Sequence, residues 1–136
     1  MPGRIEARLK ELGLELPPAH QPVANYVGFV TVGRHIHVSG VGPTWGQSVR
    51  HQGKLGRELN LSDGYAAARL TALNLLAHAK VACGGDLDRI DGCVKLLCLV
   101  NAVPGFMEAH KVADGATVLL TTLFGYDKRR ARTATT

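Results

Sequence analysis

The sequence predicts an α+β fold in a single domain. Two short β-rich runs, Val27–Val32 and His35–Val38, flank the turn residues Gly33-Arg34 and predict a hairpin. The segment 66–81 is dense in alanine and leucine, the strongest helix formers, and Ile90–Val100 is almost continuously apolar, as in a buried strand. Because helical and strand patterns alternate without a low-complexity linker, we expect helices packed on one face of a mixed β-sheet.

The first element expected is an amphipathic helix at about 3–13. Apolar residues recur from Ile5 to Leu16 at helical spacing, with charged residues between them. Gly13 and then Pro17-Pro18 end this helix, because both residue types disfavour helix continuation.

The predicted hairpin is followed by a loop. Gly33 suits the tight turn, since glycine adopts positive φ without steric cost. The next stretch, 42–56, is rich in Gly, Gln, His and Pro, and we expect a loop there with one short strand near Ser48–Gln52. Such loops between regular elements often carry binding residues.

The clearest helix in the sequence is expected to begin at 61–63. Ser62 suits the N-cap position, and Asp63 favours the positive end of the helix dipole. Gly84-Gly85 end the helix. Its many small side chains indicate close packing across the face of a sheet.

The second half of the chain is expected to contain a strand, a helix and a last strand. The near-continuous apolar character of Ile90–Val100 indicates burial on both faces, by a helix on one side and by another subunit on the other. A second helical region is expected at 106–124, with an interruption near Asp114-Gly115 and an end at Gly125. The expected order is therefore helix, hairpin, strand, helix, strand, helix, strand.

The composition is that of a globular protein of a reducing compartment. Hydrophobic residues make up 46% of the chain and charged residues 20%, which excludes a disordered chain. The three cysteines have no CxxC spacing, the N-terminus lacks a secretory apolar region, and no apolar run approaches the ~20 residues that span a bilayer. We therefore expect a cytoplasmic protein without a membrane partner.

The net charge of +5 does not by itself indicate a nucleic-acid partner. Much of the excess comes from the last nine residues, where Lys128, Arg129, Arg130 and Arg132 lie. No aromatic residues alternate with these bases to stack on nucleotides. A solvated basic end is the simpler interpretation.

Several stretches of the sequence together resemble the Rid (YjgF-type) family. These small proteins are also labelled translation initiation inhibitors, L-PSP endoribonucleases or reactive-intermediate deaminases. The resemblance includes Tyr26 and Ser39-Gly40 around the hairpin. The other matching stretches are GKLGREL (53–59), GYAAARLTALNLLA (64–77), VKLLCLVNAVPGF (94–106) and RARTA (130–134).

The resemblance implies a chorismate-mutase-like fold and an assembly. We expect a single Rid-like domain at 1–136 that forms a homotrimer, with a small carboxylate-bearing ligand in clefts between subunits and no cofactor. The chain also stops where family members continue into a last strand with a water-positioning glutamate.

The resemblance further implies a set of site residues. Arg132 matches the family arginine that binds the carboxylate of a 2-imino acid, and it is the catalytic candidate; a guanidinium can donate two parallel hydrogen bonds to one carboxylate. Tyr26 would line the pocket, and Ser39 and Gly40 would help hold the ligand. Asp114 falls near a family asparagine that contacts substrate.

Two positions of the sequence, one of them in this set, depart from the family pattern. Asp114 is an acid, which would repel an anionic ligand unless Arg132 neutralises it. Ala134 stands where many active members have a cysteine. These departures leave the question of catalysis open.

Three functions are compatible with the sequence. The first is a cofactor-free deaminase that hydrolyses 2-imino or enamine acids to 2-oxo acids and ammonia. The second is a trimeric protein that binds a small carboxylate without turning it over. The third is a ribonuclease or translation inhibitor, although no paired histidines or His–Glu couple supports RNA cleavage.

Other chemistries receive little support. His35 and His37 share a strand face and could form a metal site with His51, but no acid or cysteine lies at ligand spacing, so we expect no metal. Cys93 and Cys98 lie in an apolar strand, where a thiol stays protonated. No GxGxxG, P-loop or GxSxG motif is present.

Overall fold

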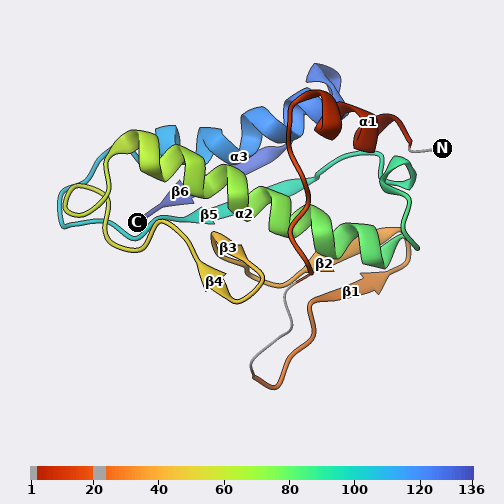
Figure 1. The fold of residues 1–136 in the computed structure, drawn as a ribbon, viewed down its shortest axis with the longest axis horizontal. Coiled ribbons are helices and arrows are strands. Elements are labelled where there is room, and N and C mark those ends of the chain that lie inside the picture. The colour runs from red at the N-terminus through yellow and green to blue at the C-terminus, as the bar shows by residue number, and fades with distance from the viewer. Residues whose placement is uncertain (1–2, 20–23) are drawn as a thin grey trace.

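The computed structural model describes residues 3–19 and 24–136, so residues 1–2 and 20–23 of the expected domain lie outside the described residues. The elements follow the expected order, with one additional short strand (Figure 1). They are α1 (Arg4–Glu11), β1 (Phe29–Val32), β2 (His35–Val38), β3 (Thr44–Trp45), β4 (Ser48–Val49), α2 (Leu61–Ala82), β5 (Lys95–Leu99), α3 (Ala109–Phe124) and β6 (Ala131–Thr135), with 3-10 turns η1 (Leu87–Arg89) and η2 (Tyr126–Lys128).

The two long helices pack side by side because small residues line their contact. A Cβ added at Gly115 of α3 would collide with the carbonyl oxygen of Tyr65 on α2 and lie 3.1 Å from the Cβ of Ala68. The expected interruption of the helix at Asp114-Gly115 is therefore wrong. The glycine is needed for the close approach of the helices, and α3 runs through it without a break.

The N-terminus of α2 corrects a second expectation. Asn60, not Ser62, is the N-cap residue: its side-chain oxygen accepts from the N–H of Asp63 at 2.8 Å, and the Asp63 carboxylate accepts from the N–H of Asn60 at 2.9 Å. This reciprocal pair is a capping box, which satisfies two N–H groups of the helix end. The helix accordingly starts at Leu61, within the range expected from the sequence.

The strands confirm an α+β fold with both antiparallel and parallel pairing. Among the described residues they form three two-stranded ladders: β1–β2 and β3–β4 are antiparallel, and β5–β6 is parallel. The strand expected near Ser48–Gln52 is shorter than predicted, at Ser48–Val49. It pairs with Thr44–Trp45, a second short strand within the segment expected to be a loop. The hairpin packs against α2, while β6 packs against α3.

The core lies between the helices and the inner face of β5. Leu96 and Val100 are buried, as is the inner face of α1 through Ile5 and Leu9. The start of α1 is fixed by Asp88, whose carboxylate accepts from the N–H groups of Arg4 and Ile5 at 2.7 and 2.9 Å. These backbone hydrogen bonds lower the pKa of Asp88, and so favour its charged form.

The outer face of β5 is exposed in the single chain. On this face Leu97 and Leu99 expose 60% and 72% of their surface, and Val94, just before the strand, exposes 72%. The helix side of the predicted two-sided burial is therefore present, whereas the other side has no cover within the described chain.

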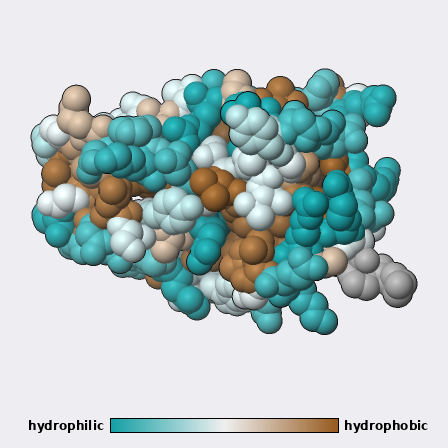
Figure 2. Space-filling view, turned by 90° about the horizontal axis from the view of Figure 1, so that it is seen from above, coloured by the Kyte–Doolittle hydropathy of each residue, from teal (hydrophilic) through white to brown (hydrophobic). Residues whose placement is uncertain are grey.

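Seen from above, apolar groups also gather at the left end of the molecule, where the loops before α2 and α3 lie (Figure 2). Among the described residues, no helix combines the length and the hydropathy that crossing a membrane requires.

The capping box can be tested with a matched pair of substitutions. We expect Asn60→Ala to lower the free energy of unfolding by about 1 kcal/mol, because it removes the side-chain acceptor at the start of α2. Ser62→Ala, an exposed position in the first turn, should change it by less than about 0.5 kcal/mol. Urea denaturation measures both, and a larger loss for the serine variant would contradict the assignment.

Candidate functional site

The guanidinium of Arg132 lies against α3. Arg132 pairs with Leu96 in the β5–β6 ladder and is directed to the helix side of the strand. Its Nη1 donates to Asp114 Oδ1 at 2.7 Å and to Thr117 Oγ1 at 3.2 Å. The two charged side chains are 25% and 46% exposed, so the ion pair is reached by solvent. The structure thus brings together two of the five predicted site residues.

Two further arginines lie beside this pair. Arg130 Nη1 donates to the carbonyl oxygen of Thr117 at 3.0 Å, and its Nη2 donates to Thr121 Oγ1 at 3.2 Å. Arg129 stacks on Tyr126, with 3.6 Å from its guanidinium carbon to the ring centroid, which is a cation–π geometry.

The three arginines line one groove of about 330 Å³, which we call the arginine groove. Hydroxyl groups, one aliphatic side chain and one aromatic ring complete its walls. Its lining residues are Thr117, Val118, Thr121, Thr122, Tyr126, Arg129, Arg130 and Arg132.

A thiol also lies near Arg132. Cys98 is opposite Ala134 in the β5–β6 ladder and is half-buried beneath the helices. Burial raises the pKa of Cys98, and the nearby positive charge of Arg132 opposes that rise. The thiol is therefore protonated at neutral pH, as the apolar strand predicts, and it is a weak nucleophile.

The hairpin residues of the predicted site form a separate group. Ser39 donates its N–H to the carbonyl of Gly28 at 2.9 Å and its hydroxyl to the carbonyl of Val27 at 2.5 Å, which closes the end of the hairpin. Tyr26 is 47% exposed just before it. Around Gly40 there is open space, since a Cβ there would meet nothing within 4 Å.

The two groups of predicted residues lie apart in the single chain. In Figure 1 the hairpin lies below α2, whereas β6 lies beside α3. The contacts of these elements agree, because β1 and β2 pack on α2 while β6 packs on β5 and α3. One copy of the chain therefore does not bring Tyr26, Ser39 and Gly40 together with Arg132.

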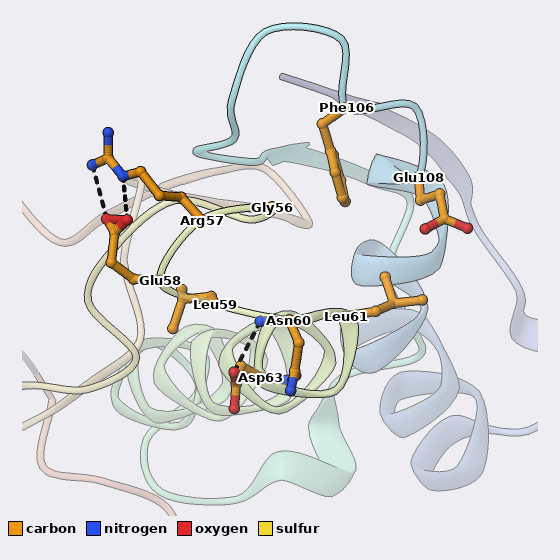
Figure 3. A pocket seen from close by; sticks show the side chains of 9 residues that line it. All are labelled: Gly56, Arg57, Glu58, Leu59, Asn60, Leu61, Asp63, Phe106 and Glu108. Carbon is orange, nitrogen blue, oxygen red and sulfur yellow. Dashed lines mark hydrogen bonds and ion pairs between the residues drawn. The ribbon is translucent and has the colours of Figure 1, made fainter.

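A second, larger hollow of about 650 Å³ lies at the N-terminal end of α2 (Figure 3). It contains none of the predicted site residues. Across it the ring of Phe106 faces the start of α2, and the Arg57–Glu58 ion pair and the capping box lie on its rim. The residues that line it are Gly56, Arg57, Glu58, Leu59, Asn60, Leu61, Asp63, Phe106 and Glu108.

The acids of this hollow are already engaged. The hydrogen bond from Arg57 lowers the pKa of Glu58, and the one from Lys111 lowers the pKa of Glu108. Asp63 is held in the capping box. The charged state is favoured at Glu58 and Glu108, and all three acids have protein partners, so this hollow offers no free general acid among these residues.

The described residues contain no group of three or more His, Cys, Asp or Glu side chains that could hold a metal ion. His35 and His37 alternate with Ile36 on β2 and are exposed. His51 lies in the loop after β4 with φ of 54°.

Comparison with known proteins identifies the family. Residues 6–136 match the family described as "YjgF/chorismate mutase-like, putative endoribonuclease". The chain belongs to the YjgF family. The sequence-based recognition is thereby confirmed, and so is the fold class.

Relatives of the YjgF-type chain agree along almost its whole length. Protein TCP17 of Trypanosoma cruzi is 42% identical over 133 residues, which are 97% of this chain and 82% of the relative. A crystal structure of a protein of unknown function from Agrobacterium tumefaciens is 42% identical with a TM-score of 0.89, covering 96% of this chain and 80% of the other. A "putative endoribonuclease" from Shewanella oneidensis is 38% identical with a TM-score of 0.88, covering 96% and 85%.

Sequence reasoning missed several residues around Arg132. Thr117 and Thr121 follow Asp114 by three and seven positions, which places all three on one face of α3. Arg130 precedes Arg132 by two positions on an extended segment, so both point the same way. Helical and strand periodicity could have indicated this cluster, but only if the packing of β6 against α3 were already known.

The Arg132–Asp114 pair suggests a competition between Asp114 and an anionic ligand. We expect Asp114→Asn to tighten binding of 2-oxobutyrate by about two- to fivefold, because removing an exposed ion-pair partner releases at most about 1 kcal/mol. Isothermal titration calorimetry measures the change. Glu11→Gln, which removes an exposed acid on α1, is the charge-matched control and should have no effect. Weaker binding in the asparagine variant would contradict the competition.

Proposed function

We propose that this YjgF-type chain is a cofactor-free deaminase that hydrolyses reactive 2-imino or enamine acids to 2-oxo acids and ammonia. The observation that carries the proposal is the state of Arg132. Within the described part of the chain, only its Nη1 has hydrogen-bond partners, while Nε and Nη2 have none. A guanidinium with two such donors in a groove is suited to a carboxylate.

The positioning of Arg132 supports a clamp rather than a mobile surface charge. Asp114 and Thr117 hold one nitrogen of the guanidinium, so little rotamer entropy remains to be lost when an anion binds. A guanidinium is a planar cation with several N–H donors, which suits recognition of a carboxylate.

The reaction requires little of the protein beyond holding the reacting groups in the right orientation. Water adds to the C2 carbon of R–C(=NH)–COO⁻, and loss of ammonia leaves R–CO–COO⁻, so one water is consumed and no electron is transferred. Arg132 would fix the carboxylate. The open hairpin end at Ser39 and Gly40 would contact the imine, and Tyr26 would cover it. Holding the reacting groups in place supplies most of the acceleration in a reaction of this kind.

We further propose that the site is completed by a second subunit of a homotrimer. Two observations support this: the hairpin group and the Arg132 group are apart in one copy, and the outer face of β5 leaves Leu97 and Leu99 exposed. An exposed apolar strand face of this kind is typical of a surface that is covered by another molecule. A second copy would cover this face and supply the missing half of each site.

The deaminase can be tested directly. We expect the protein to accelerate release of ammonia from imines that an amino-acid oxidase generates in situ, and Arg132→Ala to lower kcat/KM by about 10- to 100-fold, because a charge-assisted bidentate contact is lost. Arg69→Ala, at an exposed position on α2, is the matched control.

Two results would contradict this function. One is the absence of any acceleration by the wild-type protein. The other is full activity in the Arg132→Ala variant alongside the Arg69→Ala control.

The trimer can be tested separately. We expect multi-angle light scattering to give three times the mass of the chain at micromolar concentration. Leu97→Glu should lower that mass, since a charge would be buried in the interface. Val81→Glu, at a position on α2 that is 58% exposed, should not. A stable monomer for the wild-type protein would contradict the shared site.

A second candidate function is binding without turnover. It is favoured by Asp114, because the residue that holds Arg132 is an acid where the family has an asparagine. It is also favoured by the protonated state of Cys98, which makes this thiol a weak nucleophile. Tight binding of 2-oxo acids with no release of ammonia from imines would support this alternative. The free thiols of Cys83, Cys93 and Cys98 are in keeping with a cytoplasmic location, which we propose as well.

A further inference from the structure

The arginine groove contains more positive charge than its own acids neutralise. Three guanidinium groups line it, and the only carboxylate bonded to any of them in the described chain is that of Asp114. Asp114 accounts for one charge of the three. Arg129 and Arg130 make hydrogen bonds only to neutral protein groups there.

The arrangement of these groups is held in place by α3 and η2. Thr117 accepts hydrogen bonds from two of the arginines: its carbonyl accepts from Arg130 and its hydroxyl accepts from Arg132. Arg129 is fixed by stacking on Tyr126 and by donating Nε to the carbonyl of the same residue at 3.1 Å. The excess charge is therefore preorganised rather than spread over mobile side chains.

The position of Arg130 is costly without an anion. Its Nε is buried and has no acceptor among the described residues. Burial lowers the pKa of Arg130 and is the largest effect; Cys93 raises it by less, and the charge of Arg132 lowers it by less again. The charged form is therefore destabilised mainly by burial, and an anion nearby would stabilise it.

We propose that the arginine groove binds a ligand with two anionic groups, the first held by Arg132 and the second by Arg129 next to Arg130. This inference rests on the proposed function and names its substrate class: imines derived from acidic amino acids, or 2-imino acids that carry a phosphate. The hydroxyl group of Thr121 accepts from Arg130, lines the same groove, and can donate its proton to the second anion. A volume of about 330 Å³ suits a small dianion, at the lower end of ligand sites.

The experiment compares two product analogues that differ in one group. The probes are 2-oxoglutarate and 2-oxopentanoate, which have the same chain length but two and one carboxylates. Isothermal titration calorimetry on the full chain measures both affinities. We expect the dianion to bind about tenfold tighter or more, and the preference to shrink as salt rises, because charge-assisted contacts are screened.

A pair of charge-matched variants separates this groove from the overall charge of the protein. Arg129→Gln should reduce the ratio of the two affinities to near one. Lys128→Gln removes the same charge from the adjacent residue, which does not line the groove, and should leave the ratio unchanged. Inorganic phosphate as a competitor distinguishes the two sources: displacement of 2-oxoglutarate at low phosphate concentration favours a phosphate-bearing ligand, and weak displacement favours a dicarboxylate.

The outcomes distinguish this inference from the proposed function. Equal affinities for the two probes, or equal loss of the preference in both variants, would overturn the dianion site and leave the monocarboxylate deaminase standing. A dianion preference that depends on Arg129, without any imine hydrolysis, would support the groove and reject the deaminase. Binding of neither probe would overturn the dianion site, while the ammonia assay decides the deaminase independently.

Discussion

The contact between β6 and α3 through Thr117 is the interaction on which the site depends. One threonine accepts from Arg130 with its carbonyl and from Arg132 with its hydroxyl, and Asp114 one turn earlier fixes the second guanidinium. Without this contact the basic end of the chain would be the solvated surface that its composition suggests. With it, positive charge is concentrated in a groove between a strand and a helix, where an anion can be bound by fixed donors.

The elements of the fold were predictable from local patterns, because each has its own signal. Alternation around Gly33, the alanine-rich stretch of α2 and the apolar run of β5 predict the correct elements in the correct order. The errors arose where tertiary contacts decide. Gly115 signals a break in a helix considered alone, yet it allows α3 to approach α2. Ser62 is as good a cap as Asn60 by residue type, and only the reciprocal bond to Asp63 selects the latter.

The site was predictable only in part. The resemblance pointed to Arg132, and the structure places Asp114 against it. The resemblance could not identify Arg130 or Thr117 as neighbours of Arg132, since their contacts depend on how β6 packs against α3. Nor does one copy of the chain unite the hairpin with the arginine groove, because the hairpin packs on α2 instead. That separation makes a shared site between copies the central claim.

Subunit complementation tests that claim most directly. Arg132→Ala removes one half of the proposed site, and Gly40→Trp fills the open end of the hairpin in the other half. Neither variant alone should bind 2-oxopentanoate. After subunit exchange at equal amounts, a trimer with sites between neighbours should recover binding at about one quarter of the sites, since only that share combines two intact halves. No recovery in mixed assemblies would contradict a site built from two copies of the chain.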